Sequence, residues 1–210
     1  LPDVLKSGKS DTISIALKLI SIIGFRKYDG CIQSKEFFLE NFSACVEFLK
    51  IKPLSRYLKF LIRDILNFNH QQQAQILSIL PNFDEPQRLT DFLIKKFNEF
   101  DEIQWRDLLL TISKLRQVDG INFVIDKLDN LTPDDELILL ENLLQLKIEF
   151  SKGSTRIFRD RFETCKTIEL KMAYLRILCF GDKEIAVPLI MENLSNCPEA
   201  LITEAIQALI

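Results

Sequence analysis

Apolar side chains recur along the chain at the spacing of one face of an α-helix. The segment 34–50 places four of them at i, i+4, i+7 and i+11: Phe38, Phe42, Cys45 and Leu49. This spacing is typical of an amphipathic helix. The segment 88–100 repeats the pattern, whereas the segment 135–150 is apolar on more than one side, as in a helix packed between neighbours. Strand-like alternation is hard to find, so the pattern predicts an all-α fold.

Short polar breaks separate these segments and carry signals for helix starts. Thr132, followed by Pro133 and Asp134, supplies a side-chain acceptor for the unpaired amide groups at a helix beginning, and so does Asp182. Counting the segments predicts about 11 to 12 helices. Neither a long linker nor a shift in composition marks a second domain, so we expect a single helical domain over residues 1–210.

The helical segments recur with a period of about 32 residues, regular over residues 71–210 and irregular over residues 1–70. The first helix of each pair is predicted to begin near Gln72, Gln104, Asp135, Glu169 and Glu199. The second helix is predicted to begin near Pro86, Asp119, Ser154 and Lys183. A period of this length is a signature of stacked helical repeats.

The segment GDKEIAVPLIMENLSN (181–196) carries a Gly-Asp turn and then a helix with apolar positions from Ala186 to Leu194. It resembles a HEAT repeat, in the short bacterial form of this armadillo-like family. The resemblance covers residues 70–210 well and the first seventy residues loosely. It implies an α-α superhelix, a HEAT-like solenoid, in which an Asp in the turn caps the second helix. Asp119 and Asp182 occupy that place here.

Both ends of the chain favour a piece of a longer protein. The opening LPDVLKSGKSDTISIALKLISIIG resembles the start of HEAT regions that follow a membrane anchor in some bacterial proteins. The closing EALITEAIQALI has the pattern of a first helix without a second, and its apolar residues would need a cap or a neighbour to cover them. We expect a truncated repeat there. We also expect a cytoplasmic location, which includes that of a cytoplasmic domain in a membrane-anchored protein.

Composition narrows the chemistry that the chain can perform. A net charge of −3 gives no global attraction for nucleic acid or anionic lipid. The lone histidine, His70, excludes a multi-histidine metal site, and we interpret it as a surface or helix-capping residue. The five cysteines lack C-x-x-C spacing and are interpreted as small core residues. With neither a phosphate-binding loop nor a nucleophile-elbow motif, we predict no catalytic residues, no metal and no cofactor.

Basic residues of successive second helices form the candidate binding surface. The members of this basic stripe are Lys95, Lys96, Lys127, Arg156, Arg159 and Arg161. Because second helices line the concave face in the family that the chain resembles, the stripe could bind an acidic peptide or nucleic acid. The alternative is a solvated face, neutralised by Asp126, Asp129, Asp160 and Glu163. Trp105 likewise has two interpretations, a side chain packed between repeats or an exposed anchor for a partner.

The leading functional hypothesis is a non-catalytic scaffold that binds a protein partner along the concave face of the solenoid. One alternative is a nucleic-acid-binding protein, similar to the alkylpurine DNA glycosylases built from HEAT-like repeats. Another is a lyase of the bilin-lyase type. The glycosylases need a strongly basic groove, which the net charge of −3 disfavours, and no residue supports the lyase. We therefore expect a protein partner, no enzymatic activity and no membrane insertion by this chain itself.

Overall fold

The computed structural model describes residues 10–23, 35–148, 150–181 and 183–193, together with Glu199 and Thr203. In these ranges the regular structure consists of α-helices and short 3-10 helices, with no strand among them, which confirms the all-α class. The same ranges contain twelve α-helices. Contacts divide the chain into two compact units, Leu1–Pro86 and Gln87–Ile210. That residues 1–210 form a single domain stays a prediction.

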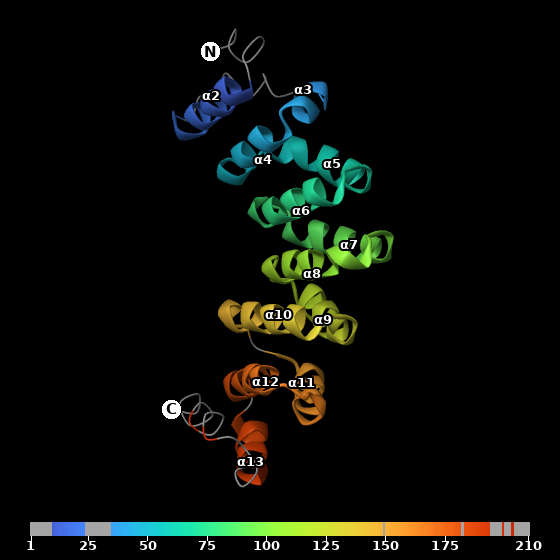
Figure 1. Ribbon diagram of the computed structural model, residues 1–210, viewed down its shortest axis with the longest axis vertical. Coiled ribbons are helices and arrows are strands. Elements are labelled where there is room, and N and C mark those ends of the chain that lie inside the picture. Colours follow the sequence, from blue (N-terminus) through green and yellow to red (C-terminus); the bar gives the residue numbers. More distant parts are fainter. Residues whose placement is uncertain are drawn as a thin grey trace. The chain divides into compact units, whose positions relative to one another are not determined.

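The first unit places α4 between α2 and α6 (Figure 1). Its helices are α2 (Ser10–Ile23), α3 (Lys35–Glu40), α4 (Phe42–Ile51), α5 (Ser55–Asp64) and α6 (His70–Ile79). The four residues expected on one helix face, Phe38, Phe42, Cys45 and Leu49, are all buried. They belong to two helices, however, because the backbone leaves the helical region at Asn41 (φ −119°, ψ 34°). The rings of Phe38 and Phe42 meet edge to face across this break, with their centroids 5.4 Å apart.

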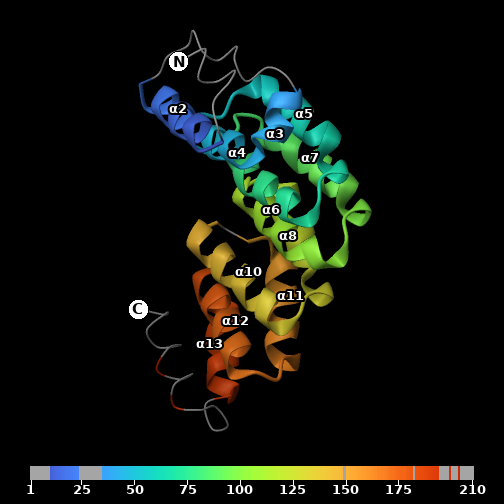
Figure 2. The same cartoon turned by 45° about the horizontal axis from the view of Figure 1, so that its top comes forward.

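The second unit is built from two layers of helices (Figure 2). Its helices are α7 (Pro86–Lys96), α8 (Trp105–Lys114), α9 (Val118–Asp126), α10 (Pro133–Leu146), α11 (Lys152–Thr164), α12 (Ile168–Gly181) and α13 (Lys183–Asn193). One layer consists of α8, α10 and α12, with α10 in contact with both of its neighbours. The other layer consists of α7, α9 and α11. Helix α11 contacts α9 within its layer and α12 in the layer behind it.

The helices begin close to the predicted positions. The first helices α6, α8, α10 and α12 begin at His70, Trp105, Pro133 and Ile168, each within two residues of its predicted start. The second helices α7, α9, α11 and α13 begin at Pro86, Val118, Lys152 and Lys183, with the same agreement. The predicted start near Glu199 falls in a segment of which only Glu199 and Thr203 are described.

The two kinds of predicted helix cap have different outcomes. Thr132 caps α10 as expected, because its side chain accepts a hydrogen bond from the backbone N–H of Asp135. The prediction that Asp119 caps the second helix is wrong, because α9 has Gln117 at its N-cap and Asp119 lies inside the first turn. The reason is the turn before it, where the left-handed backbone of Arg116 (φ 56°) and the extended Gln117 let the helix begin one residue before Asp119. Asp182 lies outside the described residues.

No helix in the described ranges combines the length and the apolar character needed to cross a bilayer.

Gly120 marks the closest approach of α9 to its neighbours. A Cβ at this position would lie 2.9 Å from Cγ2 of Thr90 on α7 and 3.0 Å from Cγ2 of Ile112 on α8. Thr90 and Ile112 are both fully buried, so neither side chain has room to move away. The absence of a side chain at Gly120 therefore sets how tightly α9 packs in the second unit.

We expect Gly120→Ala to lower the free energy of unfolding. Overpacking costs about 1 to 3 kcal/mol, which outweighs the gain of at most about 1 kcal/mol in helix propensity. Urea denaturation followed by circular dichroism measures the difference. Gly153→Ala is the matched control, because the new Cβ would meet only Oγ of Ser151, at 3.7 Å, and should leave stability equal or slightly higher. A Gly120→Ala protein as stable as the control variant would contradict the close packing of α9.

Candidate functional site

A cluster of polar side chains lies between the two layers of the second unit, where three consecutive helices meet. Glu136 comes from α10, Arg161 from α11 and Tyr174 from α12. Asp129 joins them from the 3-10 turn Leu128–Asn130 that follows α9. We call these four residues the Glu136 cluster. Each helix contributes one group, so the cluster connects parts of the chain up to 45 residues apart, from Asp129 to Tyr174.

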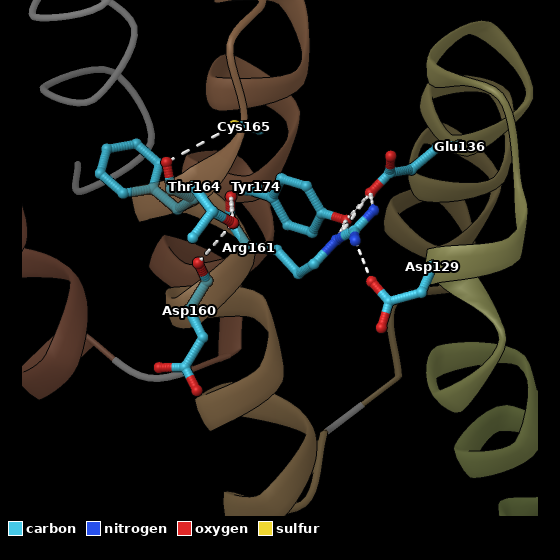
Figure 3. Close-up of polar contacts among 8 residues, drawn as sticks. Asp129, Glu136, Asp160, Arg161, Thr164, Cys165 and Tyr174 are labelled. Atoms are coloured by element: carbon cyan, nitrogen blue, oxygen red, sulfur yellow. Dashed lines mark hydrogen bonds and ion pairs between the residues drawn. The ribbon is translucent and has the colours of Figure 1, made fainter.

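The guanidinium group of Arg161 lies at the centre of the Glu136 cluster (Figure 3). Its Nε donates to Oε1 of Glu136 at 3.0 Å and approaches the hydroxyl oxygen of Tyr174 at 3.2 Å. Its Nη2 also donates to Oε1 of Glu136, and its Nη1 donates to Oδ1 of Asp129. The hydroxyl of Tyr174 donates to the same Oε1 of Glu136. One carboxylate oxygen therefore accepts from two nitrogens of a guanidinium group and from a phenol.

Burial makes these contacts energetically important. The side chain of Glu136 is 5% exposed and that of Arg161 25%, so the ion pair is screened by little water. Burial raises the pKa of the Tyr174 phenol well above its usual range, and the hydrogen bond to Glu136 adds to this shift. Burial alone would lower the pKa of Arg161, but its hydrogen bonds to Glu136 and Tyr174 outweigh that effect and raise it. The cluster therefore holds Arg161 charged and Tyr174 neutral at physiological pH.

The polar groups of the Glu136 cluster form their hydrogen bonds and ion pairs with one another. The Oε1 atom of Glu136 accepts three hydrogen bonds. The guanidinium group of Arg161 is already paired with the carboxylates of Glu136 and Asp129, so it is not available to a substrate. None of the four residues lines the pocket of the second unit that is described below. The arrangement acts as a clamp that fixes α11 against α10 and α12, and it offers no free nucleophile or general base.

Four polar contacts of the second unit, one of them within the Glu136 cluster, join equivalent positions of two successive helical pairs, α8–α9 and α10–α11. Their partners are separated in the sequence by 29 or 32 residues, which is close to the period of about 32 residues in the sequence. These contacts are Arg106 with Asp135, Ser113 with Asn142, Asn122 with Ser154, and Asp129 with Arg161. All four contacts thus bind the pair α8–α9 to the pair α10–α11.

The basic stripe is divided between an internal and an external role. Arg161 is turned inward, into the Glu136 cluster. Lys127, at the end of α9, lies 5.6 Å from the ring centroid of Phe97 and 5.5 Å from that of Phe123, as in a cation–π contact. The sequence alone thus placed these two cations on a surface where the structure shows them partly withdrawn from solvent.

The remaining members of the stripe belong to α7 and α11, where Lys95 and Arg156 are exposed and Lys96 and Arg159 are half-buried. Lys96 pairs with Glu99 at 2.7 Å, and Arg159 pairs with Asp160 at 3.4 Å and approaches Glu163 at 3.9 Å. Exposed pairs of this kind contribute little to stability. Lys95 and Arg156 are exposed and have no ion pair in the described part of the chain. Of the four acids expected to neutralise the stripe, Asp160 and Glu163 lie beside Arg159, and Asp129 pairs with Arg161. Asp126 forms no ion pair in the described ranges, and neutralisation does not extend to Lys95 and Arg156.

Glu136 and Tyr174 were missed by the reasoning from sequence, although Glu136 left a signal. It lies three, four and seven residues before Leu139, Leu140 and Leu143, and all four side chains are buried on one face of α10. An acid within an apolar helical face needs a buried cation as its partner. Tyr174 left no such signal, because a tyrosine among apolar residues looks like any aromatic core residue.

The other residues considered from sequence have structural roles. Trp105 packs against Phe97, with ring centroids 5.0 Å apart, which agrees with a packed side chain. His70 is the exposed first residue of α6, a helix capped by Asn69. Cys45 and Cys179 are buried, and burial raises the pKa of the Cys45 thiol to about 12. Cys31 and Cys197 lie outside the described residues.

No group of three or more histidine, cysteine, aspartate or glutamate side chains in the described ranges is placed to hold a metal ion. Comparisons of this chain with protein-family models, with curated proteins and with solved structures find no match.

Removing the cation of the Glu136 cluster should destabilise the second unit. We expect Arg161→Met to lower the free energy of unfolding by about 2 to 4 kcal/mol, because Glu136 would be left buried without a counter-charge. Adding Glu136→Gln should recover part of this loss, since the unpaired charge is then removed. Arg156→Met is the matched control on the same helix, and its exposed side chain should change stability by less than about 0.5 kcal/mol. Equal effects of the two arginine substitutions in urea denaturation would show that the clamp does not stabilise the fold.

The raised pKa of Tyr174 predicts a loss of stability at alkaline pH. The folded chain binds the phenol proton more tightly than the unfolded chain, whose tyrosine pKa is about 10. The contribution of Tyr174 is therefore fully present below about pH 10 and decreases above it, by about 1.4 kcal/mol per pH unit. Tyr174→Phe lacks this proton, so its free energy of unfolding should fall less steeply between about pH 9 and pH 11 than that of the parent chain. Parallel pH profiles of the two proteins would count against a buried neutral phenol.

Proposed function

We propose that this chain is a non-catalytic protein-interaction scaffold of the HEAT-like type. It binds an acidic segment of a partner protein along the second helices α7, α9 and α11. Stacked helical pairs provide an extended surface, which binds a partner through many modest contacts. In the family that the sequence resembles, the layer of second helices lines the concave face of the solenoid.

The observation that supports this proposal most directly is the state of Lys95 and Arg156. Both are exposed members of the second-helix layer, and in the described ranges neither has an acidic partner within the chain. An unpaired surface cation is available to an incoming carboxylate without first breaking an internal ion pair. Lys96 and Arg159 lie beside them, and their exposed pairs with acids are weak enough to exchange for a partner's carboxylates.

The internal contacts support the same function in another way. The Glu136 cluster and the contacts at 29 and 32 residues fix neighbouring pairs of the second unit without using the outer cations. A rigid surface loses little conformational entropy when a partner binds, which favours affinity. The scaffold is thus prepared for binding by contacts that its partner does not touch.

Affinity capture with charge-reversed variants tests the proposal. The full 210-residue chain is the bait in a native extract, with and without nuclease treatment. We expect the parent chain to retain a protein partner in both arms, and the Lys95→Glu/Arg156→Glu variant to retain at least about fivefold less, because two attractive contacts become repulsive.

Lys59→Glu/Lys166→Glu is the matched control, since it makes the same change in charge at exposed positions on α5 and between α11 and α12, outside the proposed surface on α7, α9 and α11. It should retain the partner as the parent chain does. Equal loss in both double variants would show that only net charge matters. Unchanged capture by the Lys95 and Arg156 variant would remove the basic stripe as the binding surface. Recovery only without nuclease would favour the nucleic-acid alternative.

A further inference from the structure

The second unit contains an open pocket with a volume of about 90 Å³, formed where two successive connections between first and second helices lie side by side. One wall comes from the turn between α8 and α9 and from the first turns of α9. The other comes from the loop between α10 and α11 and from the start of α11. Pockets that bind cofactors or drug-sized ligands have volumes of about 300 to 1,000 Å³. This pocket is too small for them, and it is of the size that admits one branched side chain.

Apolar side chains form most of the pocket. Ile121 is buried at its base, and Ile148 and Phe150 form the wall on the side of the loop. Phe150 is fixed there by its edge contact with Phe158, with ring centroids 5.1 Å apart. Val118 lies at the first position of α9 and is 75% exposed, although it belongs to the pocket lining. A valine so exposed beside a preformed apolar pocket is a surface that a partner side chain can cover.

Two donors of the lining are available to a ligand. Arg116 is exposed and has no ion pair within the described ranges. Asn122 uses its Oδ1 to accept from Oγ of Ser154, at 3.4 Å, and its Nδ2 has no partner in the same ranges. Ser154 and Ser151 are engaged with each other at the start of α11. The pocket therefore combines an apolar interior with a cationic and hydrogen-bond-donating edge, which is complementary to an apolar side chain next to a carboxylate.

We infer that this pocket binds one branched apolar side chain of a partner peptide segment, and that an acidic residue next to that side chain pairs with Arg116. The inference rests on the proposed scaffold function and adds to it a specific anchoring position. The pocket supplies the desolvated contact that gives most of the binding energy in a small interface, and Arg116 and Asn122 select the segment by its charge and by its backbone carbonyl groups.

Selection from a phage-displayed library of random 12-residue peptides, with the full 210-residue chain as the target, provides the test. We expect the enriched peptides to share a leucine, isoleucine or valine with an aspartate or glutamate within two residues. Val118→Ser and Arg116→Asn should each weaken binding of the enriched peptides about tenfold. Asparagine tolerates the left-handed backbone of Arg116, so that variant keeps its fold.

Lys147→Asn is the matched control. Lys147 has the same left-handed backbone (φ 50°), and the substitution removes the same charge, but Lys147 does not line the pocket. It should leave peptide binding unchanged. Equal weakening in the Lys147 and Arg116 variants, enrichment of peptides without this chemistry, or no enrichment would each overturn the pocket inference. Peptides that lose binding only in the Lys95→Glu/Arg156→Glu variant would overturn it as well, while leaving the scaffold proposal in place. If the enriched peptides bind the pocket but the chain captures no partner from extract, the pocket would be supported and the scaffold proposal would be contradicted.

Discussion

Helix α10 carries apolar side chains on more than one side, so it can be buried only between other helices. This requirement organises the second unit. Helices α8 and α12 contact α10 within one layer, and α11, which belongs to the other layer, packs against α12. Buried apolar area is the main favourable term in the fold. Any polar group that this stacking encloses must find a partner inside the protein, because water cannot reach it. The Glu136 cluster follows from this constraint, because Glu136 is enclosed with the apolar side chains of α10.

The helices could be predicted from sequence because their signals are local. Apolar spacing, the Thr132 cap and short polar breaks gave every tested helix start within two residues. The errors arose where the backbone of a turn decided the outcome. Asn41 divides one expected helix into α3 and α4, and the left-handed Arg116 shifts the start of α9 so that Asp119 does not cap it. A left-handed residue other than glycine leaves little trace in a single sequence.

The candidate site could be predicted only in part, because a sequence shows which side chains are charged but not which way each side chain points. Six basic residues on second helices were correctly placed on α7, α9 and α11 or at their ends. Which of them face outward depends on contacts with residues about one period away, such as the pairing of Arg161 with Asp129. The structure divides the stripe into cations that hold the fold together and cations that remain exposed. Arg161 compensates the buried charge of Glu136, and the exposed cations belong to the proposed binding surface.

The polar contacts at 29 and 32 residues have a consequence for how such a chain can change. Each donor finds its acceptor in the neighbouring pair, so a helical pair is not a self-sufficient module. Arg161 needs an acid at the position of Asp129, directly after the preceding pair, and Ser113 needs the side chain of Asn142 in the following pair. If α8–α9 were transplanted, Arg106 would lose Asp135, and if α10–α11 were transplanted, Arg161 would lose Asp129. A helical pair inserted between α8–α9 and α10–α11 would therefore have to carry its own partners for these polar side chains on both sides.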